Sequence, residues 1–163
     1  MHIVVALALA LAAPRMGTHA PDFAHVRTAN AHLQQTIDQA AVQSPTFAAL
    51  LARVDLTDVV VYFEYVQQLP RRARGHLHFV TSAGGHRYLR VGLPARLPRH
   101  ELIASIAHEL RHAIEIGEHW DVRCERTMKT LYSRIGDECA TGEFETRDAI
   151  KAGEAVRAEI LAP

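Results

Sequence analysis

The stretch that decides the fold is residues 102–116, which read LIASIAHELRHAIEI. Apolar residues recur through it at steps of three and four, and this period predicts a helix over residues 99–116 with one apolar face. His108 and His112 are four residues apart, about 40° around a helix axis, so their side chains leave the same face one turn apart. The sequence therefore predicts a core helix that carries a pair of imidazoles.

The pentapeptide HELRH at residues 108–112 is typical of a zinc site. Two neutral imidazole nitrogens at this spacing can bind one Zn²⁺ at about 2.0–2.1 Å each. Glu109 lies about 100° around the helix from His108, beside the ion rather than in line with the ligands. A carboxylate there can act as a general base that takes a proton from the attacking water. The alternative is a pair of surface histidines that binds no metal.

Residues 106–114, IAHELRHAI, resemble the active-site helix of the zincin metallopeptidases. The resemblance implies a zinc enzyme that hydrolyses peptide bonds, with the two histidines as metal ligands. Arg111 departs from the family, which usually has uncharged residues between the glutamate and the second histidine. In the zincin fold an edge strand near the metal helix binds extended substrate, and the resemblance implies residues 86–93 for this role.

The third metal ligand separates the zincin subclasses. The metzincin pattern requires glycine at 115 and histidine at 118, but this chain has Glu115 and Glu118. The gluzincin-like pattern instead takes a glutamate from a later helix, which gives a His₂Glu site. Three candidates follow, of which the last is preferred because we expect it in the first turn of the final helix: Glu138, Glu143 and Glu145. His119 is the alternative ligand if the chain turns back after residue 117.

Three further residues are candidates for supporting roles. Glu115 lies one turn after His112, but three ligands from one straight helix would spread over about 10 Å, so we expect it to position a histidine instead. Asp148, close after Glu145, is expected to support a ligating histidine in the same way. Tyr132 is a candidate hydrogen-bond donor to the substrate oxyanion, with packing in the core as the alternative.

The chain after its first residues also resembles, along its whole length, a group of small exported bacterial proteins with the same motif. That group has no established substrate. The resemblance supports the domain boundaries given below and a role for Glu145 more than it supports an activity. The matching segments are SPTFAALL, DVVVYFEY, GGHRYLRV, HELRHAIEI, LYSRIG and FETRDAIKAGEAVRAEI.

An apolar run, IVVALALALAA, occupies residues 3–13. As a helix it rises only about 16 Å, whereas a transmembrane helix needs about 20 residues. The run is typical of a secretory signal, although no Lys or Arg precedes it; the alternative is a buried N-terminal helix. We expect a leader over residues 1–20, export to the periplasm or beyond, and one zincin-like metal-binding domain over residues 21–163. In an oxidising compartment Cys124 and Cys139 can pair; otherwise they are two inert thiols.

The remaining pattern predicts an α+β domain. Because the strands are joined by short loops, we expect a small three-stranded, mainly antiparallel sheet with N-terminal helices, an HExxH helix and two C-terminal helices. Helices are expected over residues 22–42 and 45–54 and from about 121 and 143, a strand over 58–66, and a hairpin of strands over 75–82 and 86–93.

Composition excludes one class of function. The 163 residues hold 18 Lys and Arg against 18 Asp and Glu, so the chain lacks the basic excess of a nucleic-acid-binding protein. We therefore expect an exported zinc-dependent peptidase that acts on a peptide or protein substrate, with no nucleic-acid partner and no stable membrane span. The alternative is a non-catalytic exported module that zinc stabilises or that binds peptide.

Overall fold

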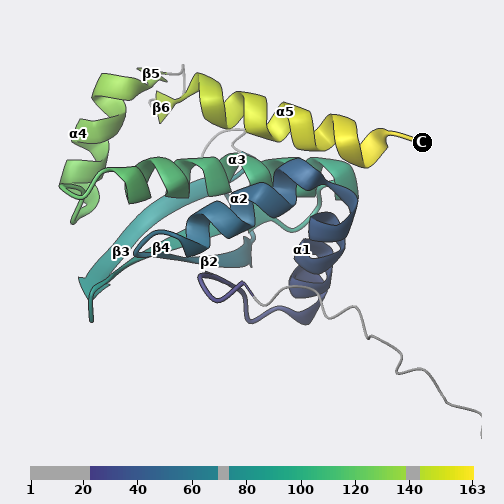
Figure 1. Ribbon diagram of the computed structural model, residues 1–163, viewed down its shortest axis with the longest axis horizontal. Helices are drawn as coiled ribbons and strands as arrows, with labels where there is room; N and C mark the ends of the chain where they lie inside the picture. Colours follow the sequence, from purple (N-terminus) through teal and green to yellow (C-terminus); the bar gives the residue numbers. More distant parts are fainter. Residues whose placement is uncertain (1–22, 70–73, 139–143) are drawn as a thin grey trace, which may run out of the picture.

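The computed structural model describes residues 23–69, 74–138 and 144–163. The expected leader over residues 1–20 lies outside this part of the chain. Within it, no helix has both the length and the apolar character needed to cross a membrane. The described elements, shown in Figure 1, are β1 (Val26–Arg27), α1 (Ala31–Gln43), α2 (Pro45–Asp55), β2 (Val59–Val66), β3 (His76–Ala83), β4 (His86–Pro94), α3 (Arg99–Glu118), α4 (Glu125–Ile135), β5 (Asp137–Glu138), β6 (Phe144–Glu145) and α5 (Arg147–Leu161).

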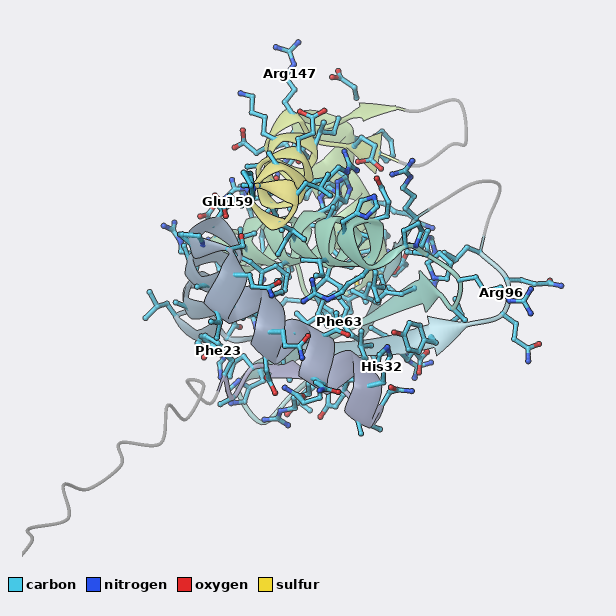
Figure 2. The ribbon with its side chains drawn as sticks, turned by 90° about the vertical axis from the view of Figure 1, so that its right-hand side faces the viewer. Phe23, His32, Phe63, Arg96, Arg147 and Glu159 are labelled. Atoms are coloured by element: carbon cyan, nitrogen blue, oxygen red, sulfur yellow. The ribbon has the colours of Figure 1, made fainter. Side chains whose placement is uncertain are left out.

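The helix α3 lies between the main sheet and α5. Figure 1 shows β2, β3 and β4 on one side of α3 and α5 on the other, with α2 beside it. Gly153 lets α5 approach closely, because a Cβ atom there would lie only 3.1 Å from the carbonyl oxygen of Ala104 on α3. Phe63 of β2 is buried in the interior, whereas Arg96 and Arg147 lie at the periphery (Figure 2). The HExxH helix is therefore the central element of an α+β structure.

The main sheet differs from the expected one. It has four strands in the order β1-β2-β4-β3, and it is mixed: β1 and β4 both run parallel to β2, and only β3 and β4 are antiparallel. The expectation of three mainly antiparallel strands is wrong because β2 and β3 do not pair, although they follow one another in sequence. Instead β4 takes the central place, with Leu89, Val91 and Leu93 fully buried, and the more polar β3 takes the edge.

The N-terminal helix is shorter than expected. It begins at Ala31 because the Asn30 side chain accepts a hydrogen bond from the Leu33 N–H at 3.0 Å and so caps it. Val26, whose spacing fitted the helical period, belongs instead to β1, where it pairs with Val61 of β2. The expected helix was too long because Val26, a buried residue of a short strand, lies at a spacing that matches the apolar positions of the helix after it.

The helix expected over residues 45–54 and the hairpin of strands expected over 75–82 and 86–93 are confirmed. Ser44 caps α2, accepting a hydrogen bond from the Phe47 N–H at 3.0 Å, and proline follows at the first helical position. Gly84 and Gly85 have φ values of 58° and 82° and form the turn between β3 and β4.

Two later helices begin after their expected positions. α4 begins at Glu125, after the cap residue Cys124, rather than near residue 121. α5 begins at Arg147, where the Thr146 side chain accepts from the Ala149 N–H at 3.2 Å, rather than near residue 143. Cys139 lies outside the described residues, and so does the expected pairing with Cys124.

A buried arginine holds the C-terminal end of α3 against the sheet. Arg87 of β4 is 1% exposed and donates to the carbonyl oxygens of Ile116 at 2.6 Å and His119 at 2.7 Å. Its Nε donates to both carboxylate oxygens of Asp58 at 3.0 Å. Burial would raise the pKa of Asp58, but the hydrogen bonds and charge of Arg87 outweigh it and lower that pKa below 3.8. We call Arg87, Asp58 and these carbonyl groups the Arg87 cluster.

Candidate metal centre

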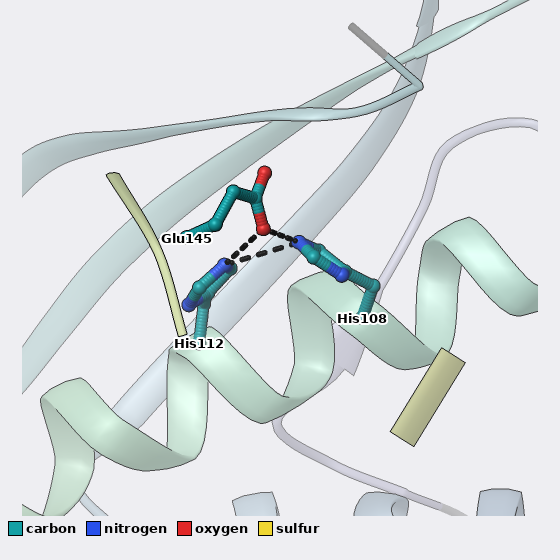
Figure 3. Close-up of side chains that lie close together, drawn as sticks. All are labelled: His108, His112 and Glu145. Atoms are coloured by element: carbon teal, nitrogen blue, oxygen red, sulfur yellow. Dashed lines mark hydrogen bonds and ion pairs between the residues drawn. The ribbon is translucent and has the colours of Figure 1, made fainter. Parts of the chain in front are cut away.

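The two histidines of α3 face one another across one helical turn. His108 Nε2 and His112 Nε2 lie 3.1 Å apart, and the two ring centroids are 4.7 Å apart (Figure 3). His112 is buried and His108 is partly buried. The helical spacing therefore brings two imidazole nitrogens to one point, as the sequence predicted.

Glu145 meets the histidines from a different element. Its Oε2 lies 2.9 Å from His108 Nε2 and 3.8 Å from His112 Nε2 (Figure 3). The residue was expected in the first turn of the last helix, but it lies in β6, which pairs with β5 and ends just before the cap of α5. Burial would raise the pKa of Glu145, but proximity to the two histidines lowers it to about 2. We call His108, His112 and Glu145 the metal cluster.

The donor atoms of the metal cluster fit one zinc ion. A tetrahedral zinc with ligand bonds of about 2.0–2.2 Å separates its ligand atoms by about 3.3–3.6 Å. The observed separations of 3.1, 2.9 and 3.8 Å bracket that range. Glu145 Oε2 is buried, and although it is close to His108 it makes no contact with hydrogen-bond geometry among the described residues. Three electron-pair donors thus converge where a cation would satisfy all of them.

A buried carboxylate holds His112 in the required orientation. Glu115 Oε2 lies 2.9 Å from His112 Nδ1, so this nitrogen donates to the carboxylate and Nε2 is the atom that faces His108 and Glu145. The Thr146 hydroxyl donates to the other oxygen of Glu115 at 2.7 Å. Burial opposes protonation of His112, but the hydrogen bonds with Glu115 and Glu145 outweigh it and raise its pKa to about 9. Glu115 therefore lies where the sequence placed a positioning carboxylate.

Thr146 was missed by sequence reasoning. It follows Glu145 directly, caps α5 and contacts Glu115, so it ties the segment of the third donor to the residue that orients His112. The sequence signal was a threonine just before an expected helix. Such a residue predicts a helix cap, but it does not predict the hydrogen bond to Glu115.

Asp148 does not support a histidine. Its side chain is 61% exposed, and Oδ2 lies 3.2 Å from an Arg111 terminal nitrogen. The expectation was wrong because Glu145 is in a strand, so Asp148 does not follow it by one helical turn. Arg111, the departure from the zincin pattern, lies between Asp148 and Glu115, with its Nε 3.5 Å from Glu115 Oε1. The arginine therefore packs behind the metal cluster.

Tyr132 packs against the metal helix. Its hydroxyl donates to the backbone carbonyl oxygen of His112 at 3.0 Å, and its ring meets the His112 ring edge to face at 5.1 Å between centroids. Burial raises the pKa of the Tyr132 phenol well above its ordinary value. Because the hydroxyl proton is engaged by the backbone, this arrangement corresponds to the packing alternative rather than to an oxyanion donor.

Glu109 is buried beside the metal cluster, against a glycine that sequence reasoning also missed. A Cβ atom at Gly75 would lie 2.2 Å from Glu109 Oε1, so only glycine fits there without displacing the carboxylate. Burial raises the pKa of Glu109, partly opposed by the nearby positive charge of His112 and His108. A lone glycine before a predicted strand carries no sequence signal for this contact.

A cavity of about 820 Å³ opens over the metal cluster. Its walls are β3 and α4, and its floor includes Glu109 of α3. The edge strand beside the site is therefore β3, and the implied role of residues 86–93 was assigned to the wrong strand of the hairpin. The apolar lining comes from both walls and from β6: Leu77, Phe79, Met128, Tyr132 and Phe144.

The alternative ligands lie elsewhere or outside the described residues. His119 ends α3, and its carbonyl oxygen belongs to the Arg87 cluster. Glu138 is in β5, opposite Phe144, and Glu143 lies outside the described residues. In the described part of the chain, the metal cluster is the one group of three or more His, Cys, Asp or Glu side chains with the proximity that a metal ion requires.

Comparison with models of protein families gives no match, and neither curated proteins nor solved structures yield one.

Proposed function

We propose that this protein is a zinc-dependent hydrolase that cleaves bonds in a peptide or protein substrate. The observation that carries the proposal is the convergence of His108 Nε2, His112 Nε2 and Glu145 Oε2 beside the buried carboxylate of Glu109. Zinc held there supplies a Lewis acid that polarises a carbonyl and acidifies a water.

The number and kind of donors favour catalysis over structural support. Structural zinc sites usually have four protein ligands, often cysteines, whereas catalytic sites have three and leave a position open. The metal cluster offers two histidines and one glutamate, and the cavity opens over it. Neither property is needed by a zinc ion that only stabilises a small domain.

Glu109 has the environment of a general base. Its raised pKa brings its proton affinity closer to that needed to accept a proton from water at neutral pH. In the proposed reaction Glu109 takes the proton of the attacking water and returns it to the departing amine. Gly75 keeps the carboxylate in place by leaving room for Oε1.

The edge of β3 suits an extended substrate. β3 pairs with β4 on one side, and among the described residues no strand pairs with its other side. An extended peptide can add to such an edge through backbone hydrogen bonds while apolar pockets take its side chains. Leu77 and Phe79 of β3 and Met128 of α4 provide that apolar lining.

Export is part of the proposal. It rests on the apolar run at residues 3–13, in which Ala8, Ala10 and Ala12 have the spacing of a signal-peptide cleavage site. The mass of the mature protein recovered after expression with the secretory machinery tests it: loss of about the first 13–20 residues supports export, and an intact N-terminus contradicts it.

The substitution Glu109→Gln tests the catalytic assignment. We expect the variant to keep the zinc content of the parent and to cleave a mixed peptide library about 10²–10⁴-fold more slowly, because the proton acceptor is lost. The control is Glu118→Gln, an exposed position of the same helix whose carboxylate lies 2.6 Å from Arg53. Equal turnover by parent and Glu109→Gln would contradict the proposal.

The non-catalytic alternative gives a different result. A module that zinc merely stabilises would unfold when a chelator removes the ion, and the zinc-loaded parent would cleave no member of the library. Circular dichroism before and after chelation, measured on the same preparation as turnover, separates the two functions.

A further inference from the structure

One backbone donor at the edge of β3 is already engaged. The Phe79 N–H donates to Glu125 Oε2 at 3.3 Å, across the outer edge of the sheet to the first turn of α4. Backbone groups of a strand alternate between its two sides, so Leu77, two residues earlier, presents its N–H and C=O to the same outer edge. Glu125 therefore occupies the edge at Phe79, while Leu77 stays available to an added strand.

Glu109 and Glu125 both line the cavity, and they contact opposite ends of one backbone segment. Gly75, just before β3, contacts Glu109, and Phe79, four residues further along the chain, contacts Glu125. At about 3.3 Å per residue, this separation is about 13 Å. An extended peptide whose reacting carbonyl lies beside Glu109 therefore reaches Glu125 after about four residues.

Antiparallel pairing fixes which end of the peptide meets Glu125. It lets one substrate residue exchange two hydrogen bonds with Leu77, through both N–H and C=O. A peptide paired in this way runs opposite to β3, from Phe79 toward Gly75. The residues that reach Glu125 are then those that precede the bond to be cleaved.

We propose that Glu125 forms the end wall of the substrate cleft, so that the enzyme binds about four residues on the amino side of the bond to be cleaved. These residues lie along β3, and further residues gain no contact because the Glu125 side chain occupies the edge of the strand at Phe79. This inference rests on the proposed function, since it takes the metal cluster as the reacting end of the cleft.

Lys129 is a charged side chain beside Glu125. Its Nζ lies 3.6 Å from Glu125 Oε1, one turn along α4, and its side chain is largely exposed. Lys129 touches the oxygen that does not accept from Phe79. Its removal therefore changes the local charge without opening the edge of β3, which makes Lys129→Ala a matched control.

A series of metal-binding peptides tests the end wall. The probes are acetohydroxamic acid and acetylated peptides of one to six residues that end in a C-terminal hydroxamate, titrated calorimetrically into the zinc-loaded protein. For the parent, we expect affinity to rise up to about the fourth residue and then to stay constant. For Glu125→Ala, the fifth residue should increase affinity about threefold to tenfold, because the freed Phe79 N–H adds one backbone hydrogen bond.

The conservative variant separates the hydrogen bond of Glu125 from its charge. Glu125→Gln retains an acceptor oxygen and should behave as the parent does, as should Lys129→Ala, with all variants shown by circular dichroism to be folded. A parent whose affinity continues to rise at the fifth and sixth residues would overturn the end wall. So would a Glu125→Ala profile equal to that of the parent.

Two further outcomes are distinguishable. If peptides that carry the hydroxamate at their amino end respond to Glu125→Ala instead, substrate runs parallel to β3 and the inferred orientation is wrong. If acetohydroxamic acid itself fails to bind the protein offered zinc, the metal site fails, and with it both the proposed function and this inference.

Discussion

Two polar clusters border the same helix and differ in how their groups are satisfied. In the Arg87 cluster, at the C-terminal end of α3, the guanidinium donates to Asp58 and to the carbonyl oxygens of Ile116 and His119. In the metal cluster, two imidazole nitrogens and a carboxylate oxygen face one another with separations of 2.9–3.8 Å. The Arg87 cluster pairs donors with acceptors within the chain, whereas the metal cluster brings three atoms that can each ligate a metal to one point.

This difference in hydrogen bonding indicates different roles for two groups of polar residues beside the same helix, α3. A buried polar group costs free energy unless it is paired, so a cluster satisfied within the chain needs nothing further. Three converging ligand atoms are the arrangement that a metal ion requires. The surroundings agree: Arg87 is almost fully enclosed, while the metal cluster lies under an open cavity. We therefore expect substitutions in the first cluster to change stability and those in the second to change zinc affinity.

The largest expected effect on stability comes from Arg87→Met. Removing the buried partner of an ion pair costs about 3–5 kcal/mol, and here the carbonyl groups at the end of α3 would also stay buried without a donor. Denaturant unfolding of the zinc-free protein measures this loss. Folded Arg87→Met should still bind the same amount of zinc per chain, because Arg87 does not touch the metal cluster.

Arg90→Met is the matched control for Arg87→Met. Arg90 lies on the same strand but is largely exposed, 3.7 Å from Glu64, so its loss should change the free energy of unfolding by less than about 0.5 kcal/mol. The pKa of Asp58 is lowered in the folded state, so its contribution is full above the ordinary value of 3.8 and is lost as pH falls through the lower folded-state pKa. The difference between parent and Arg87→Met should therefore narrow in acid; a difference that stays constant would contradict the pairing.

A smaller effect, on binding rather than stability, is expected for Glu115→Gln. The amide accepts more weakly from His112 Nδ1, so the imidazole is held less firmly and zinc affinity should fall about 10–100-fold. Competition with a chromogenic chelator gives the affinity, and Glu118→Gln on the next turn is the control. If both variants bind zinc as the parent does, Glu115 does not position the ligand.

The parts of the molecule that depend on local sequence could be predicted. The period of α3 places His108 and His112 on one face regardless of the rest of the fold, and the caps and glycine turn also act over a few residues. The order of strands in the sheet could not be predicted in this way. β2 pairs with β4, and β3 lies between these two strands in the sequence, so the pairing is not a local contact. The polar sequence of β3 was the signal that it lies at an edge.

The candidate site was predictable in its composition but not in its supporting contacts. Glu145 could be chosen as a third donor, yet its place in β6 depends on pairing with β5, and no helical period reports that. Asp148 was misassigned for the same reason. Arg87 carries a charge that sequence patterns assign to the surface, and only the carbonyl groups at the end of α3 explain its burial.

Zinc content per chain tests the central claim most directly. The measurement is elemental analysis of untagged protein after zinc has been offered and the excess removed, for the parent and for Glu145→Ala. The account predicts about one equivalent in the parent and a clear loss in the variant, since three donors hold the ion. A folded parent that retains no zinc would contradict this prediction, because His108, His112 and Glu145 would then bind no metal.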